Sequence, residues 1–70
     1  MNTRMEASDI GARLRDLRSQ RSQQEVADAL GLTAMAISSY ERGERVPLDE
    51  IKVKIADYYG KTVQEIFFAL

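Results

Sequence analysis

Short amphipathic segments, bounded by polar capping residues and glycines, follow one another along the chain. Ile10, Leu14 and Leu17 fall at positions i, i+4 and i+7, which is the spacing of one helical stripe. The same period near 3.6 continues to Ile51 and Ile55, and no alternating strand pattern interrupts it. The chain is therefore predicted to be all-α, with five short helices.

The predicted helix boundaries follow from capping chemistry. Ser8 or Asp9 is expected to cap the first helix, and the stretch 19–22 ends it. The segments 22–25 and 62–65 have the spacing of a capping box, so they are predicted to open the second and fifth helices.

The remaining boundaries come from glycines and two further caps. Gly31 is expected to end the second helix, and Thr33 to cap a third that ends at Gly43. The connection between the second and third helices is so short that it is predicted to form a sharp turn rather than the hairpin of a helix bundle. Asp49 is expected to cap the fourth helix, which Gly60 ends.

Composition narrows the function further. The chain has 70 residues, no Cys and no His, so disulfides, thiolate or imidazole metal sites and the usual nucleophile–base pairs are excluded. We expect one domain at residues 8–70 after a flexible segment at 1–7. No apolar run approaches the ~20 residues that a bilayer span needs, and no apolar signal-peptide core is present. A cytoplasmic domain without a membrane partner is expected.

Charge is spread unevenly along the chain. The formal net charge is −1, with an excess of two positive charges over residues 1–21 and of two negative charges over residues 22–48. Any affinity for nucleic acid must therefore come from the local placement of side chains rather than from the overall field.

Several motifs occur in an order that resembles a known family. The segments 23–27 (QQEVA), 31–33 (GLT) and 37–43 (ISSYERG), followed by Pro47, resemble the phage repressor/Cro-type helix-turn-helix family, also called lambda-repressor-like or Xre-type. The tail 55–67 resembles the closing helices of that family. The resemblance implies a compact five-helix domain that binds a pseudo-palindromic operator in double-stranded DNA as a homodimer.

The resemblance also implies which residues contact DNA. They lie at the start of the second helix, along the third and just after it: Gln23, Thr33, Ala34, Met35, Ser38, Ser39, Arg42 and Arg45. Gln23 matches the residue that holds a phosphate in this family. An exposed amide at a helix start has little purpose in a core, which favours the same role. Arg42 and Arg45 match a loop that approaches the DNA backbone, although both could be solvated charges.

The third helix has an unusual apolar start. Ala34 and Met35 could contact thymine methyl groups, the apolar feature of the major-groove edge, or could merely be tolerated there while Ala36 packs inward. Ser38 and Ser39 could contact bases or phosphates, or could bond back to the preceding turn.

Two arginines near the end of the first helix have separate interpretations. Arg18 and Glu41 match residues that form an internal ion pair in the family, so we interpret both as structural. Arg21 stands where that family usually has an apolar residue, and the first connection is short, so the first helix is expected to end early or dock at an unusual angle.

The apolar carboxyl end suggests an interface. Phe68 and Leu70 continue apolar past the last periodic position, and with Phe67 they are interpreted as a dimer patch, against a frayed terminus as the alternative. Phe67 is also a candidate for the core.

The leading functional hypothesis is a sequence-specific DNA-binding transcriptional regulator that represses by occupying its operator. The alternative is a protein-interaction module on the same fold with weak DNA affinity, suggested by the negative segment and the apolar third helix. An enzyme is the weakest hypothesis, because no carboxylate pair or Gly-rich phosphate loop is recognisable. No cofactor, metal or small-molecule ligand is expected.

Overall fold

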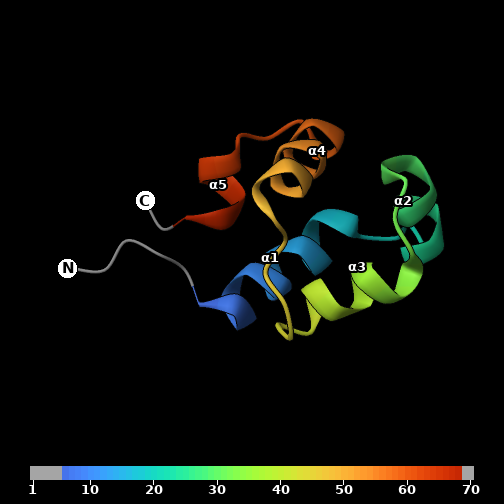
Figure 1. Ribbon diagram of the computed structural model, residues 1–70, viewed down its shortest axis with the longest axis horizontal. Helices are drawn as coiled ribbons and strands as arrows, with labels where there is room; N and C mark the ends of the chain where they lie inside the picture. Colours follow the sequence, from blue (N-terminus) through green and yellow to red (C-terminus); the bar gives the residue numbers. More distant parts are fainter. Residues whose placement is uncertain (1–5, 69–70) are drawn as a thin grey trace.

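The structure, a computed structural model, describes residues 6–68, which fold into five helices (Figure 1). Their bounds are Ala7–Arg18 for α1, Gln23–Leu30 for α2, Ala34–Glu41 for α3, Asp49–Tyr59 for α4 and Val63–Phe67 for α5. The all-α prediction is confirmed. Most of the predicted flexible segment, 1–7, lies outside the described residues.

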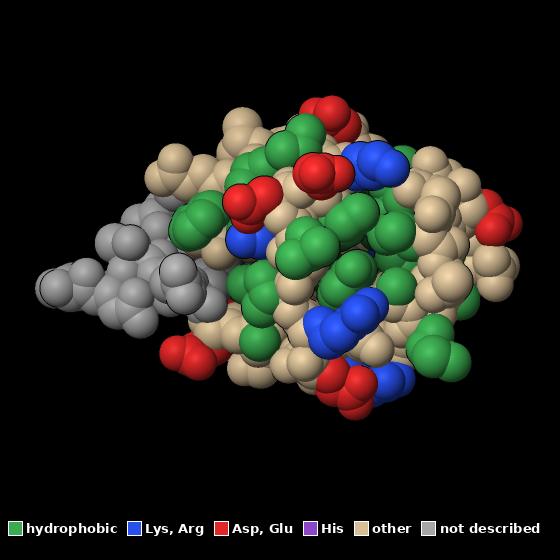
Figure 2. Space-filling view, in the orientation of Figure 1, with side chains coloured by type: hydrophobic (Ala, Val, Ile, Leu, Met, Phe, Trp, Pro, Cys, Tyr) green, Lys and Arg blue, Asp and Glu red, His purple; other side chains and the backbone are tan. Residues whose placement is uncertain are grey.

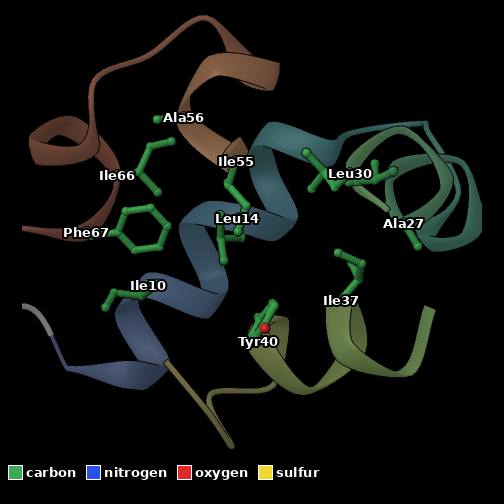
Figure 3. Packing of buried hydrophobic residues seen from close by; sticks show 11 residues of the cluster. Ile10, Leu14, Ala27, Leu30, Ile37, Tyr40, Ile55, Ala56, Ile66 and Phe67 are labelled. Carbon is green, nitrogen blue, oxygen red and sulfur yellow. The ribbon is translucent and has the colours of Figure 1, made fainter. Parts of the chain in front are cut away.

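Helix α1 runs through the middle of the molecule, with α3 on one side and α4 and α5 on the other (Figure 1). Figure 3 shows Ile10 of α1 beside Phe67 of α5, and Leu14 of α1 beside Ile55 of α4. Apolar residues of every helix complete this core: Ile10, Leu14, Val26, Ala27, Leu30, Ile37, Tyr40, Ile55, Ala56, Ile66 and Phe67. The core therefore contacts α3 through Ile37 and Tyr40.

Several predicted helix boundaries are confirmed. The Ser22 hydroxyl accepts a hydrogen bond from the Glu25 backbone N–H at 2.9 Å, which is one of the two bonds of a capping box. Thr62 and Glu65 form both bonds of such a box. Gly31 and Gly60 end their helices with φ of 71° and 69°, in the left-handed region that suits glycine.

Two predicted caps are wrong. Helix α1 starts after Glu6 rather than at Ser8 or Asp9, and the Glu6 side chain forms no capping bond. Leu48, not Asp49, is the N-cap residue of α4. Asp49 lies in the first turn instead, where a carboxylate interacts favourably with the helix dipole without accepting a capping bond.

The short connection between α1 and α2 is made by a strained turn. Helix α1 ends at Arg18, and Ser19 takes φ 55° and ψ −122°, the first central position of a type II′ turn, which favours glycine. The Arg21 N–H closes this turn on the Arg18 carbonyl at 3.1 Å. The Arg21 guanidinium then lies 5.3 Å from the Tyr58 ring centroid and 5.7 Å from that of Tyr59. Arg21 thus covers aromatic surface where an apolar residue was expected.

No helix within residues 6–68 has the length and apolar character to cross a membrane. The same residues contain no group of three or more acidic side chains placed to hold a metal ion.

Candidate nucleic-acid interface

Helices α2 and α3 are joined by a sharp turn. The left-handed Gly31 lets the Leu32 N–H return to the Ala27 carbonyl at 2.8 Å. Thr33 then starts α3, because its hydroxyl accepts a hydrogen bond from the Ala36 N–H at 3.1 Å. The turn places α3 across α2 and against α1 (Figure 1), which is the geometry of a helix-turn-helix unit.

An ion pair between the partly buried Arg18 and the buried Glu41 fixes the carboxyl end of α3. The Glu41 carboxylate accepts hydrogen bonds from Arg18 Nε at 2.6 Å and Arg18 Nη2 at 2.8 Å, and the two side chains are only 18% and 4% exposed for Arg18 and Glu41. These hydrogen bonds raise the pKa of Arg18 above its usual value. The predicted internal pair is confirmed.

Two more side chains bind the same residue. The Gln23 amide Nε2 donates to the Glu41 carboxylate at 3.1 Å, and Arg15 donates to the Glu41 backbone carbonyl at 2.9 Å. Gln23 is half-buried, so the sequence argument that its amide has little internal purpose is wrong. We call Arg15, Arg18, Gln23 and Glu41 the Glu41 clamp. The clamp joins α1, the start of α2 and the end of α3.

Glycine permits this close approach of α1 and α3. A Cβ at Gly11 would lie 2.3 Å from the Glu41 carbonyl oxygen and 2.8 Å from that of Tyr40. Backbone atoms cannot yield as a flexible side-chain end can, so the position accepts no larger residue without separating the helices. The close contact of α1 with the end of α3 therefore depends on the missing side chain at Gly11.

The opposite face of α3 faces away from the core. Met35 is 76% exposed, whereas Ala34, Ser38 and Ser39 are half-buried. Ala36 packs against the core, in agreement with the interpretation that it faces inward. The side chains of Met35 and Ala34 carry no hydrogen-bond donor, so the start of α3 presents an apolar surface.

The arginines that follow α3 have local partners. Arg42 forms an exposed ion pair with Glu44, with Nη2 to Oε1 at 2.9 Å and Nε to Oε2 at 3.1 Å, and it also donates to the Ser38 hydroxyl. Arg45 lies over the Tyr40 ring, 5.2 Å from its centroid. Both arginines were predicted to approach the DNA backbone, or to be solvated charges. The pairing of Arg42 with Glu44 was not predicted, although the opposite charge two residues later was an available signal.

The predicted dimer patch is only partly available. Phe67 is 1% exposed and fills the core, so its side chain has no surface to offer a second subunit. Phe68 is half-buried against that core, and Leu70 lies outside the described residues. The large exposed apolar side chains lie elsewhere: Met35, Val46, Leu48 and Val53. Hydrophobic side chains gather near the centre of the face in Figure 2, flanked by charged ones.

Comparison with known sequences decides the family. Residues 12–66 match the helix-turn-helix family HTH_3. The chain belongs to this family. Residues 12–66 are therefore a helix-turn-helix domain of the Xre or lambda-repressor-like type.

Individual relatives agree with this assignment. The chain is 35% identical over 59 residues to the cryptic phage CTXphi transcriptional repressor RstR of Vibrio cholerae, a match that covers 81% of this chain and 53% of that protein. The chain thus spans about half the length of this curated relative.

Solved structures give the same fold. The restriction-modification controller protein C.AhdI from Aeromonas hydrophila is 30% identical, with a TM-score of 0.80 over 87% of this chain and 96% of that one. The P22 c2 repressor, solved in complex with a synthetic operator, has the same TM-score of 0.80 at 23% identity, over 83% of this chain and 91% of that one. Because the sequence identity to the P22 c2 repressor is low, this similarity shows only that the two chains share a fold.

Proposed function

We propose that this helix-turn-helix domain is a sequence-specific DNA-binding transcriptional regulator that represses by occupying operator DNA in the cytoplasm. The observation that carries the proposal is the two-sided environment of α3. The Glu41 clamp holds its inner side to α1 and α2, while Met35 on its outer side is exposed. A helix held in this way can enter the major groove as a rigid element.

The proposed contacts divide into two groups. Gln23, Thr33, Arg42 and Arg45 position the domain on phosphates, because they lie at the start of α2, at the start of α3 and just after α3. The base-reading group lies along α3: Ala34, Met35, Ser38 and Ser39. The clamp gives Gln23 an internal partner through Nε2, and this bond orients the side chain while leaving the amide oxygen and the second amide hydrogen available.

The apolar start of α3 suggests what is read. Neither Ala34 nor Met35 can form the bidentate hydrogen bonds that discriminate bases by about 1–3 kcal/mol each. Their natural target in the major groove is the thymine methyl group. We therefore expect operator positions opposite them to be thymine, with weaker discrimination at other positions.

A selection of bound duplexes from a random pool tests the proposal. It should return one recurring sequence, and replacing thymine by uracil at the position opposite Met35 should weaken binding severalfold in the wild type but not in Met35→Ala. Val53→Ala is the matched control, because Val53 is an exposed apolar residue on α4. Recovery of no preferred sequence would contradict sequence-specific binding, and indifference to uracil at every position would contradict methyl reading.

We further propose that the chain binds a pseudo-palindromic operator as a homodimer. The exposed apolar side chains, together with the half-buried Phe68, could form a self-complementary contact between two subunits. The selected sequence should then contain two inverted half-sites about 10 base pairs, or a multiple of this, apart. A single half-site bound by one subunit in sedimentation experiments would contradict the dimer.

A protein-interaction module is the second candidate. It is favoured by Leu48 and Met35, which are 78% and 76% exposed, and by the negative excess over residues 22–48. Salt separates the two candidates, since DNA affinity falls steeply with salt concentration while an apolar protein contact hardly changes.

A further inference from the structure

The arginine expected to approach DNA is already bound to a carboxylate of its own chain. Arg42 contacts Glu44 through two hydrogen bonds, at 2.9 and 3.1 Å. Both side chains are about half exposed, 54% for Arg42 and 56% for Glu44. The pair lies directly after α3, on the segment that leads to α4.

The donors of the guanidinium show what this pairing prevents. Glu44 occupies Nε and Nη2, which form the edge that matches two oxygens of a phosphate or carboxylate. The remaining nitrogen, Nη1, donates to the Ser38 hydroxyl. Three of the five N–H donors of Arg42 are therefore engaged, and a bidentate phosphate contact through the Nε edge requires that Glu44 leave.

We propose that Glu44 is a built-in competitor of DNA phosphate for the Arg42 guanidinium, and that it lowers the charge-driven affinity of the domain for DNA. The inference rests on the proposed DNA-binding function and adds a residue that weakens rather than makes a contact. When a phosphate takes the Nε edge of Arg42, Glu44 must be displaced, and its own negative charge is then left close to the phosphates.

Two further observations support the proposal. The Arg42 guanidinium holds the pKa of Glu44 below its usual value, so the competing carboxylate is charged at neutral pH. The Glu44 backbone N–H donates to the Ser39 carbonyl at 3.0 Å, which keeps the residue beside the end of α3. Glu44 is thus held at the proposed interface rather than free to move away from it.

Removing the charge of Glu44 tests the proposal. Wild type, Glu44→Gln, Arg42→Gln and the double variant are titrated with a random-sequence duplex at several salt concentrations. The matched control is Asp57→Asn, which removes one exposed negative charge on α4, on the other side of α1 from α3 (Figure 1). Thermal unfolding checks that each variant is folded. Substitutions at an exposed ion pair should leave the unfolding midpoint unchanged.

Glu44→Gln should bind about fivefold more tightly than wild type near 0.1 M salt, with a salt slope steeper by up to ~0.9, the value for one phosphate. Asp57→Asn should gain less than about twofold, because it lies far from the phosphates. In the Arg42→Gln background, Glu44→Gln should add no more than Asp57→Asn does.

Other results would distinguish a failure of the competitor role from a failure of the proposed DNA binding. Equal gains for Glu44→Gln and Asp57→Asn, or a gain that persists without Arg42, would overturn the competitor role while leaving DNA binding intact. Weaker binding by Glu44→Gln would show that Glu44 positions Arg42 for DNA and would also overturn it. Failure of every folded variant to bind any duplex would overturn the proposed function and this inference together.

Discussion

Two arginine–glutamate pairs lie at the same end of α3 and behave as opposites. Glu41 pairs with Arg18 in a nearly buried environment, and Glu44 pairs with Arg42 in a half-exposed one. Both contacts use Nε and Nη2 of the arginine on two carboxylate oxygens. Identical chemistry therefore serves two purposes, and burial decides between them.

Burial matters because it sets what happens when one partner is lost. Removing one member of a buried pair leaves an uncompensated charge in a poorly solvated site. Water replaces the lost partner of an exposed pair at little cost. The Glu41 clamp can thus hold α3 in position, whereas the Arg42–Glu44 pair can exchange partners when another anion approaches.

The largest effect is expected at the clamp. Glu41→Gln should lower the free energy of unfolding by roughly 3 kcal/mol, because the Arg18 charge loses its carboxylate. Urea denaturation at neutral pH measures the change, with Glu44→Gln as the same substitution at the exposed pair. A loss below about 1 kcal/mol, the range of surface ion pairs, would show that the two pairs do not differ.

The next effect concerns the close approach that buries Glu41. Gly11→Ala should destabilise the fold by about 2 kcal/mol, since the added Cβ meets the Glu41 backbone and overpacks the interface. Alanine otherwise favours a helix by up to about 1 kcal/mol over glycine. A net stabilisation in thermal or urea unfolding would therefore contradict the contact between α1 and the end of α3.

A gain is expected at the turn that follows Arg18. Ser19→Gly should stabilise the protein by about 1 kcal/mol, because φ 55° with ψ −122° strains a residue with a Cβ. Gln20→Gly is the control, and it should destabilise through added freedom in the unfolded chain. If both substitutions lower the unfolding midpoint, the turn does not have the described geometry.

Tyr59 reports the burial around the clamp through its titration. Burial, with a further contribution from the Glu41 charge, raises the pKa of Tyr59 to about 12. Between pH 10 and 12 the unfolded chain loses this proton before the folded one, so the free energy of unfolding should fall as pH rises. Tyr59→Phe should reduce that fall; identical pH profiles for both proteins would contradict it.

The smallest effect is expected at the exposed pair. Arg42→Gln and Glu44→Gln should leave the unfolding midpoint unchanged within error, because solvent screens both charges. The same variants are expected to change DNA affinity. A clear loss of stability would mean that this pair supports the fold and is not free to exchange.

The sequence predicted the helices better than it predicted the side-chain contacts. Apolar spacing and the glycines at 31 and 60 defined the elements, because helix periodicity and left-handed ends are local properties. The Arg18–Glu41 ion pair was predicted from the family resemblance rather than from a local pattern. The caps at Glu6 and Leu48 form no side-chain bonds, so capping chemistry left no signal there.

The candidate site shows the same limit. The bond from Gln23 to Glu41 joins residues far apart in sequence and depends on how α2 packs against α3. The burial of Phe67 follows from the docking of α5, which an apolar run at a chain end does not reveal. Local patterns therefore indicated residues of the proposed interface without showing which of them already have partners within the domain.

The central claim is that α3 is held from inside and free on its outer face. Amide chemical shifts recorded while the labelled protein is titrated with its selected duplex test this most directly. The account predicts shifts concentrated at 33–45 and at Gln23, with Val53 and the core residue Ile66 unaffected. Shifts confined to α4, or none along α3 at saturation, would contradict it.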